Sequence, residues 1–331
     1  MIGGASITAL HPTRPIIAYS SGCMIIVYDV LTDQKINLVH HQSEVTALAF
    51  SPPGAASQTS TVGSGGEFLI SLDMNTNDLS DLGTHSLSTM CFWHWQRGEL
   101  HQEIPIPRSQ NNVGFLLQPN QGGASPRSFQ IAFEKVGGTF MVLDTSSSDM
   151  NGGGYRATIW VINRQQRIDM LGQLELELTA TCLGLQIVPS SKTVSSSLNP
   201  SLTTVGTQYL QTRLRFLTLE KNCVKIWEYQ AGHAELLKKI QIKQILRQCV
   251  VAELTGYLLI LGDNGKVLIL DQEGEFVSTI HKDGVSFSVI GAASNDKILL
   301  GTDRGTVCVY NMASLQFINE IPFQLSVLSN F

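Results

Sequence analysis

The stretch Thr306–Asn311 (TVCVYN) decides the fold, because segments of the same kind recur throughout the chain. Each is a run of strand-forming residues that ends in an aromatic or branched residue and then a polar one. The other five are Met24–Asp29, Thr89–His94, Thr158–Asn163, Cys223–Glu228 and Lys266–Asp271. Tyr310 follows Leu270 by 40 residues, and Leu270 follows Trp227 by 43. These steps match the period of a four-stranded propeller blade, which predicts an all-β fold.

The last two units show the four strands most clearly. In the first of them the expected strands are Val250–Leu254, Tyr257–Leu261, Val267–Leu270 and Phe276–Ile280. In the second they are Phe287–Ile290, Ile298–Gly301, Val307–Tyr310 and Gln316–Glu320. In the hairpin before Val267, Asn264-Gly265 predicts a type I′ turn, which requires two positive φ angles. A single meander of this size cannot bury both faces, so the sheets must stack on one another.

The earlier units are longer, with steps of 65, 69 and 65 residues from Tyr28 through Trp93 and Ile162 to Trp227. The excess is rich in Gly, Ser, Thr, Asn and Pro, which indicates inserted surface loops. These are residues 52–66, 75–88, 109–128, 145–154 and 190–208. Such loops either carry partner contacts or are tolerated sequence drift. Residues 234–247 have a weak helical pattern, but the blade register favours a strand over Leu236–Ile242.

The repeats divide a single domain of residues 1–331 into six blades. Their approximate bounds are residues 5–42, 43–107, 128–177, 179–243, 247–281 and 285–323. The first blade begins with a strand at Ser6–Leu10, and Leu325–Phe331 is left for one further strand. Six four-stranded blades plus a partial seventh indicate an incomplete ring or a piece of a longer tandem-propeller protein. An incomplete ring would expose a strand edge, which is an association hazard.

Composition narrows the class of protein. Hydrophobic residues make up 43% of the chain and charged residues 15%, which excludes an intrinsically disordered protein. The net charge of -5 disfavours nucleic-acid binding, although a local basic patch remains compatible with it. The six cysteines form no CxxC pair, which favours free buried thiols in a reducing compartment. The chain has no signal peptide and no long apolar span, so we expect a cytoplasmic protein without membrane contact.

The sequence carries no recognisable catalytic, cofactor or metal motif. A phosphate-binding loop, a G-x-S-x-G elbow and a zinc-ligand spacing are all missing. His94 lies between Trp93 and Trp95, where it could gate a ligand, but on a strand it would point to the opposite face from both tryptophans. We therefore expect no enzyme, no cofactor and no metal site.

The repeat endings resemble those of WD40-repeat propellers. Five residue pairs stand where that family has its Trp-Asp dipeptide: Tyr28-Asp29, Trp93-His94, Trp227-Glu228, Leu270-Asp271 and Tyr310-Asn311. The stretch His41–Pro52 is similar to the family's entry into a blade. There a histidine bonds through a Ser or Thr and an Asp toward the Trp. The resemblance implies such a chain through His41, Ser71, Asp73 and Trp93, and implies that the other blades rely mainly on apolar packing.

The resemblance also carries a functional expectation. The opening stretch His11–Tyr28 looks like the first blade of large tandem-propeller scaffolds of cilia, centrioles and spindle poles. It implies a non-catalytic scaffold in a ciliary, centriolar or microtubule-associated assembly that binds other proteins through its rim and inserted loops. Two alternatives stay open. One is an adaptor subunit of a trafficking or ubiquitin-ligase complex, and the other is a propeller that binds a small ligand in its central channel.

Overall fold

The computed structural model describes most of the strand-forming sequence and few of the inserted loops. The described residues are 7–12, 14–52, 68–74, 88–106, 129–134, 138–144, 155–163, 166–178, 182, 184–188, 213–230, 232–252, 255–292 and 297–322. They fall into two compact units, residues 1–177 and residues 178–331, here called the N-terminal and C-terminal units. The five insertions predicted above, and the further strand expected at Leu325–Phe331, lie wholly or largely outside the described residues.

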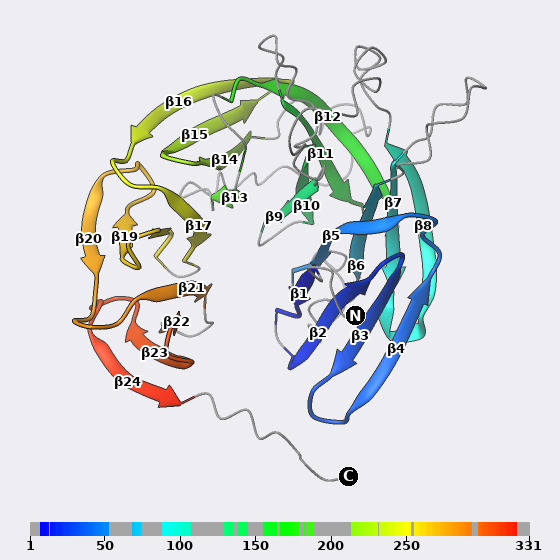
Figure 1. Cartoon of the computed structure of the whole chain (residues 1–331). Helices are drawn as coiled ribbons and strands as arrows, with labels where there is room; N and C mark the ends of the chain where they lie inside the picture. Colours follow the sequence, from blue (N-terminus) through cyan, green and yellow to red (C-terminus); the bar gives the residue numbers. More distant parts are fainter. Residues whose placement is uncertain are drawn as a thin grey trace, which may run out of the picture. The chain divides into compact units, whose positions relative to one another are not determined.

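The N-terminal unit contains three four-stranded antiparallel sheets (Figure 1). The first sheet is β1 (Thr8–Leu10), β2 (Ile16–Ser21), β3 (Met24–Asp29) and β4 (Gln34–Val39). The second is β5 (Glu44–Phe50), β6 (Leu69–Met74), β7 (Ser88–His94) and β8 (Glu99–Ile106), with a short 3-10 helix η1 (Trp95–Arg97) between β7 and β8. The third is β9 (Phe129–Phe133), β10 (Thr139–Asp144), β11 (Tyr155–Ile162) and β12 (Ile168–Leu176).

The C-terminal unit repeats this arrangement with three more sheets. The fourth sheet is β13 (Gly184–Val188), β14 (Arg213–Glu220), β15 (Cys223–Gln230) and β16 (His233–Gln241). The fifth is β17 (Leu246–Val251), β18 (Leu258–Gly262), β19 (Val267–Leu270) and β20 (Phe276–Ile280). The sixth is β21 (Phe287–Ala292), β22 (Lys297–Thr302), β23 (Thr306–Asn311) and β24 (Phe317–Pro322). In every sheet consecutive strands pair antiparallel, so each sheet is a propeller blade.

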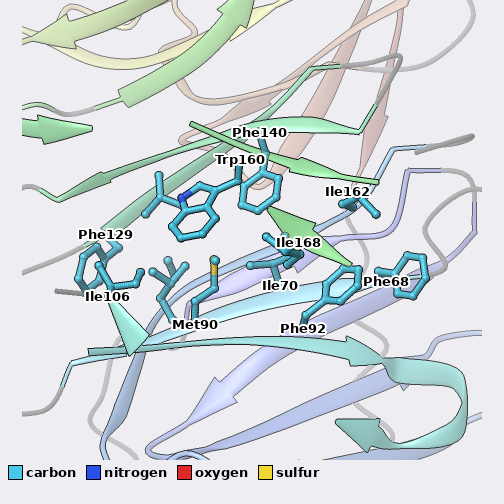
Figure 2. Packing of buried hydrophobic residues seen from close by; sticks show 13 residues of the cluster. Phe68, Ile70, Met90, Phe92, Ile106, Phe129, Phe140, Trp160, Ile162 and Ile168 are labelled. Atoms are coloured by element: carbon cyan, nitrogen blue, oxygen red, sulfur yellow. The ribbon is translucent and has the colours of Figure 1, made fainter. Parts of the chain in front are cut away.

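The fold class is therefore all-β, with six four-stranded blades of a β-propeller, as predicted. No α-helix occurs among the described residues. The sheets stack because their strands bury alternate residues: along β2, Ile16, Ala18 and Ser20 are buried while the residues between them are half-exposed. Figure 2 shows one inter-sheet core of the N-terminal unit, where Phe140 and Trp160 of the third sheet pack against Ile70 and Met90 of the second.

The structure contains the strands predicted around residues 234–254, but one strand has different ends and the predicted turn type is wrong. The uncertain segment around residues 234–247 contains a strand, β16, as the blade register required. The first strand of the fifth sheet is β17, four residues earlier than the predicted Val250–Leu254. The predicted type I′ turn is wrong, because Gly265 has a positive φ of 68° and Asn264 does not. The Gly265 N–H donates to the Gly262 carbonyl (3.2 Å), which fits a type I turn closed by a left-handed glycine.

Candidate functional site

The second blade holds a buried chain of polar side chains. His41 lies three residues before the start of β5, Ser71 and Asp73 lie on β6, and Trp93 lies on β7. The His41 Nε2 is 2.7 Å from the Ser71 Oγ, and its Nδ1 is 3.1 Å from the Asp73 Oδ2. The Trp93 indole N–H donates to the Ser71 Oγ at 2.7 Å. The structure thus brings together the four residues that the resemblance singled out.

One assignment of protons satisfies every member of this chain. Asp73 also accepts the Thr89 backbone N–H at 2.7 Å, so its carboxylate acts as an acceptor on both oxygens. His41 then donates from Nδ1 to Asp73 and accepts the Ser71 hydroxyl proton at Nε2, while the Ser71 oxygen accepts from Trp93. The chain links β6 and β7 to the loop before β5, and fully satisfied buried networks of this kind fix strand register.

An Asp, a His and a Ser in this order also make the catalytic triad of many hydrolases. Here the side chains of all three are buried, and Ser71 has no exposed surface. Its oxygen is already engaged by the Trp93 indole, which is where a substrate carbonyl would have to approach. The geometry therefore supports a structural role for this chain rather than attack on a substrate.

The fourth blade departs from the expectation that blades without the histidine rely mainly on apolar packing. The Trp227 indole donates to the Thr218 Oγ1 at 3.0 Å, which repeats the Trp93–Ser71 bond on the equivalent strands. Glu220 lies two residues after Thr218, as Asp73 does after Ser71. In place of a histidine, Lys225 on β15 brings its Nζ to 2.8 Å from the Glu220 Oε1. Both charged side chains are almost fully buried, so a buried ion pair replaces the His–Asp pair.

Sequence reasoning missed this second network although a signal for it exists. Ser71-Leu72-Asp73 and Thr218-Leu219-Glu220 share a hydroxyl residue, a leucine and an acid at the end of a second strand. The family pattern is anchored by a histidine before the first strand of a blade, and the fourth blade has no histidine in the residues before Gly184 that would take that place. The third blade keeps a smaller remnant, because the Trp160 indole donates to the Thr158 Oγ1 at 2.8 Å.

The remaining dipeptide positions act locally and are not brought together. Asp29 and Asn311 each end a third strand, and Asp271 directly follows one. All three accept backbone N–H groups of the turn that follows, for example Leu31 on Asp29 (2.9 Å). Glu228 pairs with Arg213 across the fourth sheet at 2.8 Å. The first members of these pairs have other contacts. Tyr28 bonds Asp33 at 3.0 Å, whereas Leu270 and Tyr310 are buried in sheet cores.

The His94 side chain does not pack between the rings of Trp93 and Trp95. Its ring packs against Phe68 and His101, at centroid distances of 4.5 and 4.8 Å. Trp93 and Trp95 instead belong to the core between the first and second sheets. Within the described part of the chain, no group of three or more His, Cys, Asp or Glu side chains is placed to hold a metal ion. The described residues also contain no helix long and apolar enough to cross a membrane.

The cysteines are free thiols, and five of the six are buried. Burial raises the pKa of Cys91 to about 12 and has the same effect on the pKa of Cys182 and of Cys249. A thiol that stays protonated is a poor nucleophile, so these groups behave as small apolar core residues.

A cavity of about 390 Å³ opens at one rim of the N-terminal unit, between the first and second sheets. Its floor is apolar and includes Ile16 and Val27 of the first sheet and Trp95 of η1. Arg14, from the loop between β1 and β2, and Asp29, at the end of β3, line its edge. The cavity contains no residue of either polar network. The sequence did not predict it, because the cavity forms only where loops of the first sheet meet η1 of the second sheet, and that contact depends on how the two sheets stack.

Comparison with known proteins identifies the architecture. No protein-family model matches the chain, and no curated protein matches it. Among solved structures, Saccharomyces cerevisiae Sqt1, a WD40 protein, matches 96% of this chain and 74% of its own with a TM-score of 0.55. At 12% identity this likeness shows the fold alone. Since 1179 chains of known structure match, the architecture is common and indicates no single function.

Proposed function

We propose, from the WD40-type propeller fold as premise, that this chain is a non-catalytic scaffold that binds other proteins through its rim. The placement of the polar side chains carries the proposal. His41, Ser71 and Asp73, which are residue types found in catalytic triads, are buried and hydrogen-bonded within the second blade, whereas the rim presents exposed charged and apolar groups. A propeller of this kind supports a protein-interaction scaffold generally, and such folds are typically non-catalytic.

We further propose that the assembly is cytoplasmic and cytoskeletal, at a cilium, centriole or spindle pole. The opening stretch His11–Tyr28, which resembles the first blade of tandem-propeller scaffolds, supports this. The microtubule surface is acidic, so direct contact by a chain of charge -5 requires a segregated basic area. An indirect role would need no such area.

A small group of exposed cations in the C-terminal unit supports direct contact. Lys221 lies in the turn between β14 and β15, and Lys243 and Arg247 lie in or just after the loop before β17; all three are exposed. The two segments adjoin, because the Leu246 N–H donates to the Lys221 carbonyl at 2.7 Å. Within the described ranges none of these cations forms an ion pair. They are therefore available to an acidic partner.

Cosedimentation with microtubules tests direct contact. We expect binding at low salt that weakens as ionic strength rises, because exposed charges are screened. The double variant Lys221→Glu with Lys243→Glu should bind several-fold more weakly. The control variant Lys35→Glu reverses an exposed cation of the first sheet and should bind as the wild type does. Failure of the wild type to sediment at low salt would reject direct contact.

Affinity purification of the tagged protein with mass spectrometry tests the wider proposal. Recovery of ciliary, centriolar or spindle-pole proteins is the expected result. Recovery of ubiquitin-ligase or trafficking subunits instead would favour the adaptor alternative, and imaging of the tagged protein would separate cytoskeletal from other locations. A chain that recovers no protein partner above background would contradict the scaffold proposal itself.

A further inference from the structure

The cavity between the first two sheets has the apolar floor and the volume of a ligand-binding site. Its floor joins the buried core, where Trp95 is held edge-on against Phe50 (centroids 5.8 Å apart) and His11 (5.7 Å). The floor is therefore a preformed apolar surface that does not have to rearrange. At about 390 Å³ the cavity lies in the size range of ligand sites and can hold an amino-acid side chain with part of its backbone.

The lip of the cavity extends this apolar surface outward. Leu31, in the turn between β3 and β4, is 80% exposed. The turn is fixed, because Asp29 accepts the N–H groups of Leu31 (2.9 Å) and Thr32 (3.2 Å), and Tyr28 bonds Asp33. Leu31 is thus presented to solvent beside an apolar cavity. A ligand that occupies the cavity and also covers Leu31 must be longer than one side chain.

The polar groups of the edge indicate the chemistry of that ligand. Gln34 and Gln96 line the cavity and are exposed, and their amides form no hydrogen bond in the described part of the chain. Such amides can donate to and accept from a peptide backbone. The Thr32 and Leu31 N–H groups and the nearby Arg14 guanidinium lower the pKa of the Asp29 carboxyl group, so the edge carries one anion and one cation. Arg14 is exposed and forms no ion pair among the described residues, so its N–H donors are available to a ligand carboxylate.

We propose that this cavity, the first-sheet cavity, binds an extended peptide segment of a partner protein in which an apolar side chain adjoins an acidic one. The apolar side chain fills the cavity over Trp95, the backbone bonds the two glutamine amides, and the carboxylate pairs with Arg14. A second apolar contact falls on Leu31. The inference rests on the proposed function, since it assigns one binding site and one class of partner to the scaffold.

Selection of peptides from a displayed random library against the full chain tests the inference. We expect enriched peptides to place an Asp or Glu beside a large apolar residue. A synthetic, fluorescein-labelled copy of an enriched peptide should bind Arg14→Glu and Leu31→Ser at least about tenfold more weakly, which corresponds to about 1.4 kcal/mol each. A copy with Lys in place of the acid should regain affinity for Arg14→Glu, which a misfolded variant could not show.

Two matched variants control for surface changes in general. Leu10→Ser removes a leucine that is 73% exposed in the same sheet but does not line the cavity, and Lys297→Glu reverses an exposed cation of the other unit. Both should bind the peptide as the wild type does. The inference is overturned if no peptide is enriched, if the enriched peptides lack the acid, or if Arg14→Glu and Leu31→Ser leave binding unchanged. If those two variants still recover every partner in affinity purification, the cavity inference fails and the scaffold proposal stands.

Discussion

At the scale of single residues, the buried Lys225–Glu220 pair makes the sharpest prediction. Replacing Lys225 with Met removes the cation beside a carboxylate that has no exposed surface. Because a buried charge that loses its counter-charge is costly, Lys225→Met should lower the free energy of unfolding by about 3–5 kcal/mol. Urea denaturation measures this.

The double variant Lys225→Met with Glu220→Leu removes both charges and should recover most of that loss, because an apolar pair of similar volume needs no desolvation. Lys238→Met is the matched control, since Lys238 pairs with Glu275 in the same unit at a site open to solvent. It should cost at most about 1 kcal/mol. A double variant less stable than Lys225→Met alone would contradict this account of the pair.

At the scale of elements, the hairpin between β18 and β19 depends on Gly265. Its φ is 68°, and a Cβ built there would lie 2.0 Å from the Ser286 Oγ and 2.9 Å from the Ser286 Cα. Gly305 takes the same place in the next sheet with a φ of 72° and open space around it. Gly305→Ala should therefore cost about 1–2 kcal/mol for backbone strain alone. Gly265→Ala should cost more, because Ser286 must also move; equal losses in thermal unfolding would rule this contact out.

The same hairpin shows what a sequence can predict about this fold. Strands such as β19 and β20 follow from β-forming runs at a fixed period, and both match their predicted bounds. The turn type did not follow, because Asn-Gly is compatible with more than one turn and the contact with Ser286 comes from the loop just before β21. The polar chain of the second blade rested on a family motif anchored by His41. Thr218-Leu219-Glu220 carries a local signal for the acid of the Lys225–Glu220 pair, but the choice of Lys225 as its partner depends on the contact between strands. The first-sheet cavity depends on how two sheets stack, which no local pattern encodes.

At the scale of the whole molecule, the reactivity of the buried thiols shows whether either unit opens. Cys91 lies in the N-terminal unit and Cys182 and Cys249 in the C-terminal unit, and burial raises the pKa of each to about 12. Cys23 is the exposed cysteine. At pH 8 an aromatic disulfide reagent should modify one thiol per native chain and six after unfolding in urea. Modification of three or more without urea would show that a unit opens readily.

The raised pKa values also fix the direction of the alkaline response. In the unfolded chain a cysteine ionises near its ordinary pKa of about 8.5, whereas the folded thiols stay protonated, so the folded state binds more protons above that pH. The stability contributed by burial is fully present below about pH 8.5 and is lost as pH rises toward 12. The variant Cys249→Ala should show a shallower loss of unfolding free energy between pH 9 and pH 11. Cys23→Ala, the control at the exposed site, should keep the wild-type slope. A slope unchanged in Cys249→Ala would mean that this thiol ionises in the folded state, which its complete enclosure by apolar strands argues against.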